Sequence, residues 1–229
     1  VEPAPVGVVG IITPWNYPLA LTMMDVIPAL MAGNAVVQKA DNQTAKTVQL
    51  ARKLSVEAGI PDHIWQVVHG EPAVVGNAVT DNADCVAFTG STATGKIVAQ
   101  RAASRLIGYS LELGGKNPMI VLPGADLNQA AETAIGGAFG NSGQLCVSIE
   151  RLYVPQHSLK EFEQILKAKV ESLKLGNSDK FDFDLGALTS SAQLERVSGF
   201  VERAAKEGAE ILTGGKPLPE IGPNFFAPT

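Results

Sequence analysis

The chain has 229 residues, of which 45% are hydrophobic and 18% are charged, and its formal net charge is −5. This balance is typical of a globular protein that buries one large core or two smaller ones. It lacks the basic surplus of proteins that bind nucleic acid or an anionic membrane surface, so we expect a small-molecule partner. The two cysteines, Cys85 and Cys146, show neither metal-ligand spacing nor a disulfide framework. We therefore expect no metal site and a reducing, cytoplasmic location.

The apolar run at residues 6–12 is the first element of the chain. It is too short to cross a bilayer, and no basic segment precedes it as in a secretion signal. Its β-branched residues predict instead a strand that is buried on both faces, as in a parallel sheet.

Strands and helices alternate through the first half of the chain. The expected strands are residues 6–12, 35–38, 65–69, 85–88 and 107–113. The expected helices are residues 19–32, 43–58, 72–79 and 91–103. Gly33 and Gly59 are suited to end the first two helices, and Asn42 is suited to cap the second. The alternation predicts a doubly wound, mostly parallel α/β sheet of the Rossmann type, which binds ligands at the carboxyl ends of its strands.

The same rhythm restarts in the second half. Further strands are expected at residues 118–122, 151–154 and 210–213, and helices at residues 127–139, 157–173 and 190–207. We therefore expect two domains, a nucleotide-binding domain at residues 1–117 and part of a second, catalytic α/β domain at residues 118–229.

A thiol and a carboxylate each lie in a glycine-rich loop. Cys146 follows Gly143 and Gln144, a polar setting that argues against the alternative of a small buried hydrophobe. Glu112 precedes a Gly-Gly pair and is a natural base for activating the water that releases a covalent intermediate. Its leucine neighbours favour partial desolvation, which raises a carboxyl pKa, although an exposed carboxylate at a strand end is the alternative.

A third candidate, Asn16, lies at the end of the first expected strand. Its side-chain amide can donate a hydrogen bond to an oxyanion, and two prolines and two aromatic residues fix the loop around it. Taken by itself, the position of Asn16 indicates only an ordinary turn residue.

Candidate cofactor residues follow several strands, although the first turn has no Gly-x-Gly-x-x-Gly fingerprint. Gly90 and Ser91 open a helix whose free N–H groups can meet a pyrophosphate, or they simply cap that helix. Lys39 follows the second strand, where a ribose hydroxyl or phosphate would lie. The remaining candidates either pack beside the cofactor or permit close backbone approach, and are Ile12, Thr13, Trp15, Gly70 and Gly76.

Four motifs occur together in the order typical of one enzyme family. They are Pro14-Trp15-Asn16-Tyr17-Pro18, Phe88-Thr89-Gly90-Ser91, Glu112-Leu113-Gly114-Gly115-Lys116 and Gly143-Gln144-Leu145-Cys146. The chain thus resembles the NAD(P)-dependent aldehyde dehydrogenases nearly end to end, and most of all their succinate-semialdehyde branch. The resemblance implies that the full-length protein continues beyond both ends of this chain and forms a homo-oligomer.

The resemblance also implies roles for single residues. Cys146 becomes the nucleophile, Glu112 the base, and Asn16 an oxyanion donor together with the backbone N–H of Cys146. The family's counterpart of Lys39 binds the adenosine ribose, and a glutamate three residues later often binds the diol. Asn42 holds that place here, so NADP should be accepted, while the carboxylate of Asp41 leaves NAD open.

The sequence therefore predicts oxidation of an aldehyde, of the succinate-semialdehyde type, through a thiohemiacetal and a thioester on Cys146. Two alternatives stay open. One is a cofactor-independent thiol esterase that uses Cys146 and Glu112, and the other is a catalytically inactive nucleotide-binding fragment. Aldehyde-dependent formation of NAD(P)H distinguishes the oxidation from both.

Overall fold

The computed structural model describes residues 4–180 and 182–229. The chain divides into two compact units, Val1–Gly114 and Gly115–Thr229. The boundary expected from the sequence, after residue 117, lies slightly further along the chain. Each unit has its own sheet and its own core.

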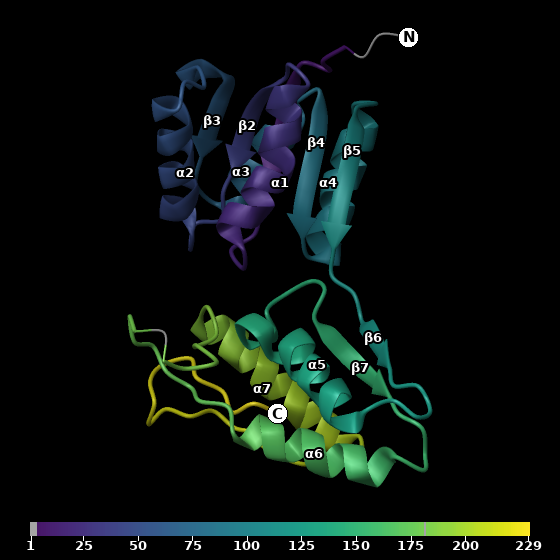
Figure 1. The fold of residues 1–229 in the computed structure, drawn as a ribbon. Coiled ribbons are helices and arrows are strands. Elements are labelled where there is room, and N and C mark those ends of the chain that lie inside the picture. The colour runs from purple at the N-terminus through teal and green to yellow at the C-terminus, as the bar shows by residue number, and fades with distance from the viewer. Residues whose placement is uncertain (1–3, 181) are drawn as a thin grey trace. The chain divides into compact units, whose positions relative to one another are not determined.

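The first unit is built around a parallel sheet (Figure 1). Its strands are β1 (Val8–Ile12), β2 (Ala35–Lys39), β3 (Trp65–Val68), β4 (Cys85–Gly90) and β5 (Gly108–Leu113). Its helices are α1 (Pro18–Met31), α2 (Ala45–Glu57), α3 (Pro72–Asn82) and α4 (Thr92–Ser104), with a short 3₁₀ turn at Asp62–Ile64. The strand order β3-β2-β1-β4-β5 reverses direction at β1, so the expected doubly wound fold is confirmed.

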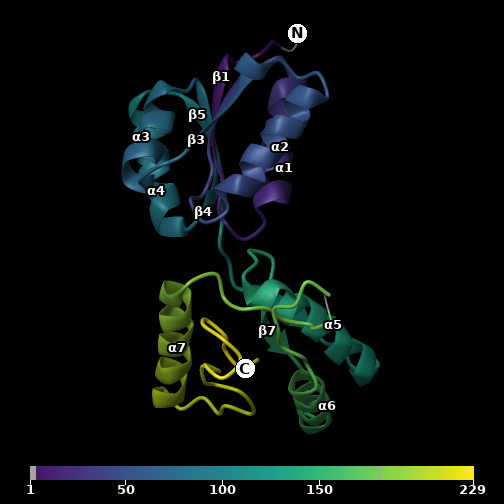
Figure 2. The same cartoon turned by 90° about the vertical axis from the view of Figure 1, so that its left-hand side faces the viewer.

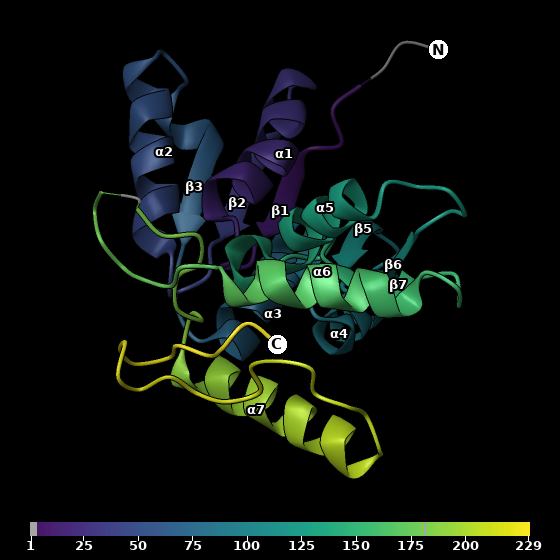
Figure 3. The same ribbon diagram turned by 60° about the horizontal axis from the view of Figure 1, so that its bottom comes forward.

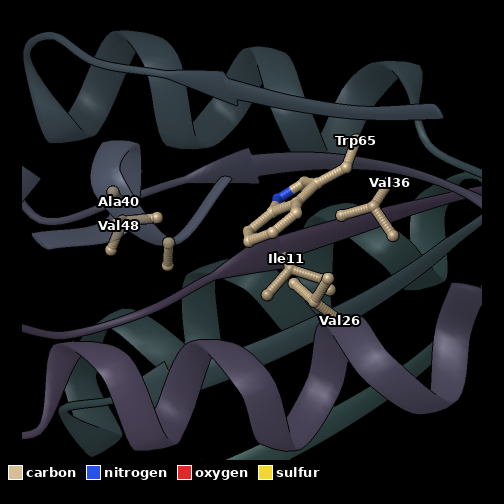
Figure 4. Packing of buried hydrophobic residues seen from close by; sticks show 7 residues of the cluster. Ile11, Val26, Val36, Ala40, Val48 and Trp65 are labelled. Atoms are coloured by element: carbon tan, nitrogen blue, oxygen red, sulfur yellow. The ribbon is translucent and has the colours of Figure 1, made fainter. Parts of the chain in front are cut away.

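Two apolar layers hold this sheet between its helices. Helices α1 and α2 cover one face and α3 and α4 the other, as the edge-on view of Figure 2 shows. On the α1/α2 side, Trp65 extends over Ile11 and Val36 in the cluster drawn in Figure 4. On the other side, Val86 and Phe88 of β4 face α3 and α4. Consecutive residues of a strand point to opposite faces, so both layers are filled by apolar side chains.

Of the three residues predicted to begin or end α1 and α2, two do so. Gly33 and Gly59 have φ values of +83° and +105° and end α1 and α2 in the left-handed conformation that glycine adopts without strain. Asn42, however, does not cap α2. The helix begins at Ala45, and the side chain of Asn42 is bonded instead to the backbone of Gly70.

The second unit has a smaller sheet, in which β6 (Asn117–Ile120) pairs with β7 (Ile149–Tyr153) in parallel. Its helices are α5 (Leu127–Phe139), α6 (Leu159–Glu171) and α7 (Ser191–Lys206). Val121, three alanines of α5 and Phe162 of α6 form its core. Figures 2 and 3 show α7 apart from α5 and α6, with the C-terminal segment beside it.

The strand expected at residues 210–213 is wrong. This stretch has no strand partner in the described chain, and the nearest pairing is the single bridge between Pro217 and Phe226. A short apolar run forms a strand only where a neighbouring strand can accept its hydrogen bonds.

No helix among the described residues is long and apolar enough to cross a membrane.

Candidate active site

A cavity of about 510 Å³ lies in the first unit at the carboxyl ends of β1, β2 and β4. This is the point where the strand order reverses, and doubly wound sheets bind their ligands there. Most of the residues expected to contact a cofactor line this cavity. They are Ile12, Thr13, Trp15, Lys39, Gly76, Gly90 and Ser91.

Lys39 has the most unusual environment of these residues. It is only 3% exposed, and no ion pair or hydrogen bond of its ammonium group is found within residues 4–180 and 182–229. Asp41 and Glu71 also line the cavity, but neither forms an ion pair with Lys39. Lys39 lines the cavity and its ammonium group is not sealed in the interior, so the site suits a ligand that brings an anionic or hydrogen-bond-accepting group to Lys39.

Ser91 fixes the start of α4 at the cavity wall. Its hydroxyl accepts the N–H of Thr94 at 3.2 Å as an N-cap, which confirms the capping alternative for this residue. Capping does not remove the other role, because N–H groups of a first helical turn and the positive helix end remain available to an anion.

Asn42 and Gly70 do not line the cavity. The side-chain amide of Asn42 donates to the carbonyl of Gly70 at 3.0 Å, and its oxygen accepts the N–H of Gly70 at 3.3 Å. Asn42 thus joins the loop after β2 to the loop after β3. Gly70 has a φ of +142° and its Cβ position would lie 2.7 Å from Val75, so a side chain there would be both strained and blocked.

The sequence analysis did not predict that residues of two helices line this cavity. Glu71, just before α3, and residues from the first two turns of α3 and α4 line it, among them Pro72, Asn77, Thr94, Ile97 and Val98. The spacing of Thr94, Ile97 and Val98, at positions i, i+3 and i+4, was the available signal, since it places three side chains on one face of α4.

A buried polar network holds the loop that carries Asn16. Gln38 of β2 is fully buried, and its amide donates to the hydroxyls of Thr13 at 3.0 Å and Thr22 at 2.8 Å. Its oxygen accepts the indole N–H of Trp65 at 3.1 Å. The network ties the end of β1 to α1, β2 and β3, so the segment that leads into the half-buried Asn16 starts from a fixed point.

Glu112 lies near the end of β5, and the expected desolvation by its leucine neighbours is wrong. Leu111 and Leu113 pack into the layer under α3 and α4, so Glu112 points to the α1 side and is exposed. Its neighbour there is Asp25 of α1. Burial, and then the charge of Glu112, raises the pKa of Asp25.

Cys146 lies in an exposed loop of the second unit, after α5. Asn141, Ser142 and Gly143 have φ values of +51°, +56° and +74°, so the chain passes through a left-handed turn before it reaches the thiol. Two non-glycine residues in this conformation cost free energy, which the surrounding contacts must offset. Residues 145–148 then form a β-turn, in which the N–H of Ser148 donates to the carbonyl of Leu145 at 3.0 Å.

Side chains bond this loop to its surroundings at several points. Ser142 donates to the carbonyl of Gly186, and the oxygen of the Gln144 side chain accepts the N–H of Thr189. The hydroxyl of Ser148 reaches the carbonyls at the end of α5. The thiol of Cys146 is therefore exposed on a backbone that is held from several sides.

The remaining candidates are less suited to chemistry. Both cysteines are unpaired, but Cys85 is half-buried on β4. His69 contacts Gln49 through a ring nitrogen. Among the described residues, no group of three or more His, Cys, Asp or Glu side chains is placed to hold a metal ion.

Comparison with known sequences gives a match to the family described as the aldehyde dehydrogenase family, over residues 1–229. A Mycobacterium tuberculosis protein is 50% identical over 225 residues, 98% of this chain, and its name gives NADP-dependent succinate-semialdehyde dehydrogenase as a provisional activity. A Bacillus subtilis protein named alpha-ketoglutaric semialdehyde dehydrogenase is 40% identical over 93% of this chain. The chain spans 43% and 44% of the length of these relatives.

Solved structures show the same fold. An NADP-dependent enzyme of Escherichia coli superposes with a TM-score of 0.94 at 36% identity, over 98% of this chain and 47% of its own. Betaine aldehyde dehydrogenase of Staphylococcus aureus, solved with NAD+, also gives a TM-score of 0.94, at 35% identity over 98% of this chain and 45% of its own.

Proposed function

The chain belongs to the aldehyde dehydrogenase family, and on that premise we propose that the whole protein oxidises an aldehyde to a carboxylic acid with NADP or NAD. The observation that carries the cofactor part is Lys39, which lines the cavity at the switch point of the sheet and whose ammonium group has no partner among the described residues. The substrate we propose is succinate semialdehyde, because the 50%-identical relative bears that provisional name.

The chemistry begins at Cys146. Its thiolate adds to the aldehyde carbon, and the carbonyl oxygen becomes negative. Asn16 and the backbone N–H of Cys146 donate hydrogen bonds to that oxygen, each stabilising the charge by a few kcal/mol. A nicotinamide bound in the cavity would supply the hydride acceptor, and loss of the hydride from the adduct would leave a thioester on Cys146. Glu112 then takes a proton from water, and the hydroxide adds to the thioester carbonyl and expels the Cys146 thiolate to give the acid.

We propose that the cofactor binds to residues that line the cavity. Lys39 would meet the ribose or its phosphate, and the N-terminal turn of α4 behind Ser91 would meet the pyrophosphate. Ile12, Thr13, Trp15, Gly76 and Gly90 would pack beside it. The bonds between Asn42 and Gly70 support an indirect role for both, in shaping the loops at the cavity edge.

Absorbance at 340 nm tests the oxidation. The purified whole protein, mixed with succinate semialdehyde and NADP, should form NADPH. Cys146→Ala should abolish the signal, whereas the matched variant Cys85→Ala should retain it. NADPH formation that survives in Cys146→Ala would contradict the assignment of the nucleophile.

A thermal shift tests the cofactor site separately. NADP should raise the melting temperature of the chain, and Lys39→Met should remove most of that rise, while Lys46→Met on the exposed side of α2 should not. An equal rise in the Lys39 variant would contradict the site.

A second candidate function is nucleotide binding without oxidation. It is favoured by the cofactor cavity, which residues of the first unit line without any contribution from the second. A rise in melting temperature with NADP, with no NADPH formed from any aldehyde, would support this second function.

We extend the proposal to a cytoplasmic homo-oligomer. The free state of both cysteines supports a reducing compartment, and the oligomer rests on the family resemblance alone. Sedimentation velocity that gives a monomer of the whole protein would contradict the oligomer.

A further inference from the structure

Asn117, at the start of β6, contacts the nucleophile loop in a way that nothing in its sequence position indicated. Its side-chain amide donates to the carbonyl of Cys146 at 2.7 Å and to the carbonyl of Ser148 at 2.9 Å. Both N–H bonds of one amide are thus directed at the segment that carries the thiol. Gly115 leaves room for this side chain, because a Cβ there would lie 3.1 Å from the oxygen of Asn117.

These bonds fix the peptide planes on both sides of Cys146. The plane that follows it is held through its own carbonyl by Asn117. The plane that precedes it is held through the carbonyl of Leu145, which accepts the N–H of Ser148. In a trans peptide the N–H points opposite to the C=O, so the N–H of Cys146 is directed away from the turn. No hydrogen bond of that N–H is found within the described ranges.

The pairing of β6 with β7 is irregular next to Asn117. The register shifts between Asn117, which pairs with Ile149, and Pro118, which pairs with Arg151, so Glu150 is an extra residue in β7. Pro118 has no N–H to give to the ladder. The amide of Asn117 adds hydrogen bonds to Cys146 and Ser148, just before β7 begins, and the adjacent Lys116 forms an ion pair with Glu150.

We infer that Asn117 is a positioning residue for Cys146: its amide holds the turn that aims the thiol and the backbone N–H of Cys146 at the substrate. This inference rests on the proposed role of Cys146 as nucleophile. Asn117 itself does not touch the reacting atoms.

Hydrogen exchange of residues 144–150 tests the holding bonds directly, in the 229-residue chain. Asn117→Asp keeps the size of the side chain but replaces both donors with a carboxylate that faces two carbonyl oxygens. At pH 7 the exchange of this segment should be about 10-fold faster than in the unmodified chain. Asn117→Ala should be as fast, and the matched exposed variant Asn128→Asp should leave the segment unchanged.

Lowering the pH separates donation of a hydrogen bond from mere space filling. A protonated carboxyl can donate one O–H, so exchange in Asn117→Asp should return toward that of the unmodified chain as the pH falls to about 4. Exchange in Asn117→Ala should stay fast, each rate being compared with the unmodified chain at the same pH. Unchanged exchange in both variants at pH 7, or no recovery in Asn117→Asp at low pH, would overturn the inference.

Kinetics then connect the loop to the reaction. Asn117→Asp should lower kcat for aldehyde oxidation about 10-fold and leave the KM for NADP unchanged, because the cofactor cavity is built by the first unit alone. A change in that KM with kcat unaffected would contradict a positioning role. If the unmodified whole protein oxidises no aldehyde, the proposed function fails, while the exchange experiment still decides whether Asn117 holds the loop.

Discussion

The cofactor cavity of the first unit and the thiol loop of the second are held by different means. In the first unit the candidate residues follow the ends of adjacent parallel strands, and a fully buried glutamine ties three strands and a helix together behind them. In the second unit Cys146 lies on an exposed loop whose conformation depends on separate hydrogen bonds from side chains to carbonyls. The first site is held by one connected buried network, and the second by separate bonds from Asn117, Ser142 and Ser148, of which only Ser148 is buried.

This difference predicts how each site fails. Removing a buried polar group leaves several partners unsatisfied, so damage in the first unit should appear as lost stability. Removing one bond of an exposed loop should cost less stability and act mainly on the reactivity of the thiol.

The largest loss is expected for Gln38→Leu in the first unit. The change leaves the Trp65 indole N–H and the hydroxyls of Thr13 and Thr22 buried without their partner. We expect the free energy of unfolding to fall by about 3 kcal/mol, measured by urea titration. In the matched variant Gln66→Leu, which loses one exposed hydrogen bond to Asp62, the free energy of unfolding should fall by about 1 kcal/mol or less. Equal losses in the two variants would contradict the role of the network.

A smaller loss is expected for Ser148→Ala in the second unit. The change removes the hydroxyl that bonds the loop to the carbonyls of Gly137 and Ala138. We expect the free energy of unfolding to fall by about 1 kcal/mol in the same urea titration, together with faster hydrogen exchange in the loop. The control is Ser104→Ala, whose hydroxyl forms an exposed bond within α4. A loss as large as that of Gln38→Leu would remove the contrast between the units.

The smallest effect is expected for Asp25→Asn, and it should depend on pH. Burial and Glu112 raise the pKa of Asp25, so the folded state binds this proton more tightly than the unfolded state does. Stability is therefore lost as the pH rises from the ordinary value of 3.8 through the raised pKa, and the loss persists at neutral pH. Asp25→Asn should be more stable than the unmodified chain at pH 7, with the gain vanishing near pH 3.

Urea titrations at pH 7 and near pH 3 measure this gain, with the exposed variant Asp179→Asn as the control. A gain of the same size at both pH values would mean that the charge of Asp25 is not its source.

The two units also differ in how well the sequence predicted them. In the first, β-branched runs and terminal glycines such as Gly33 located the strands and the helix ends, because burial on both faces leaves few other arrangements. The same logic located much of the cofactor cavity, since parallel strands bring their carboxyl ends to one edge. It failed for Asn42, whose amide found a backbone partner across a loop rather than at a helix end.

Long-range contacts account for the other errors. Leu111 and Leu113 flank Glu112 in sequence but point to the opposite face of the sheet, so neighbours along a strand gave a wrong estimate of its burial. Residues 210–213 have strand-like composition but no partner strand in the described chain. The role inferred for Asn117 depends on a contact across 29 residues, which no local pattern contains.

The most direct test of the central claim is the mass of the peptide that contains Cys146 after a single turnover. The variant Glu112→Gln, mixed with succinate semialdehyde and NADP and quenched in acid, should carry one acyl group on Cys146. One equivalent of NADPH should form with it, because deacylation is slowed about 100-fold. NADPH formed without an acyl group on Cys146, or an acyl group found on Cys85 instead, would contradict the account.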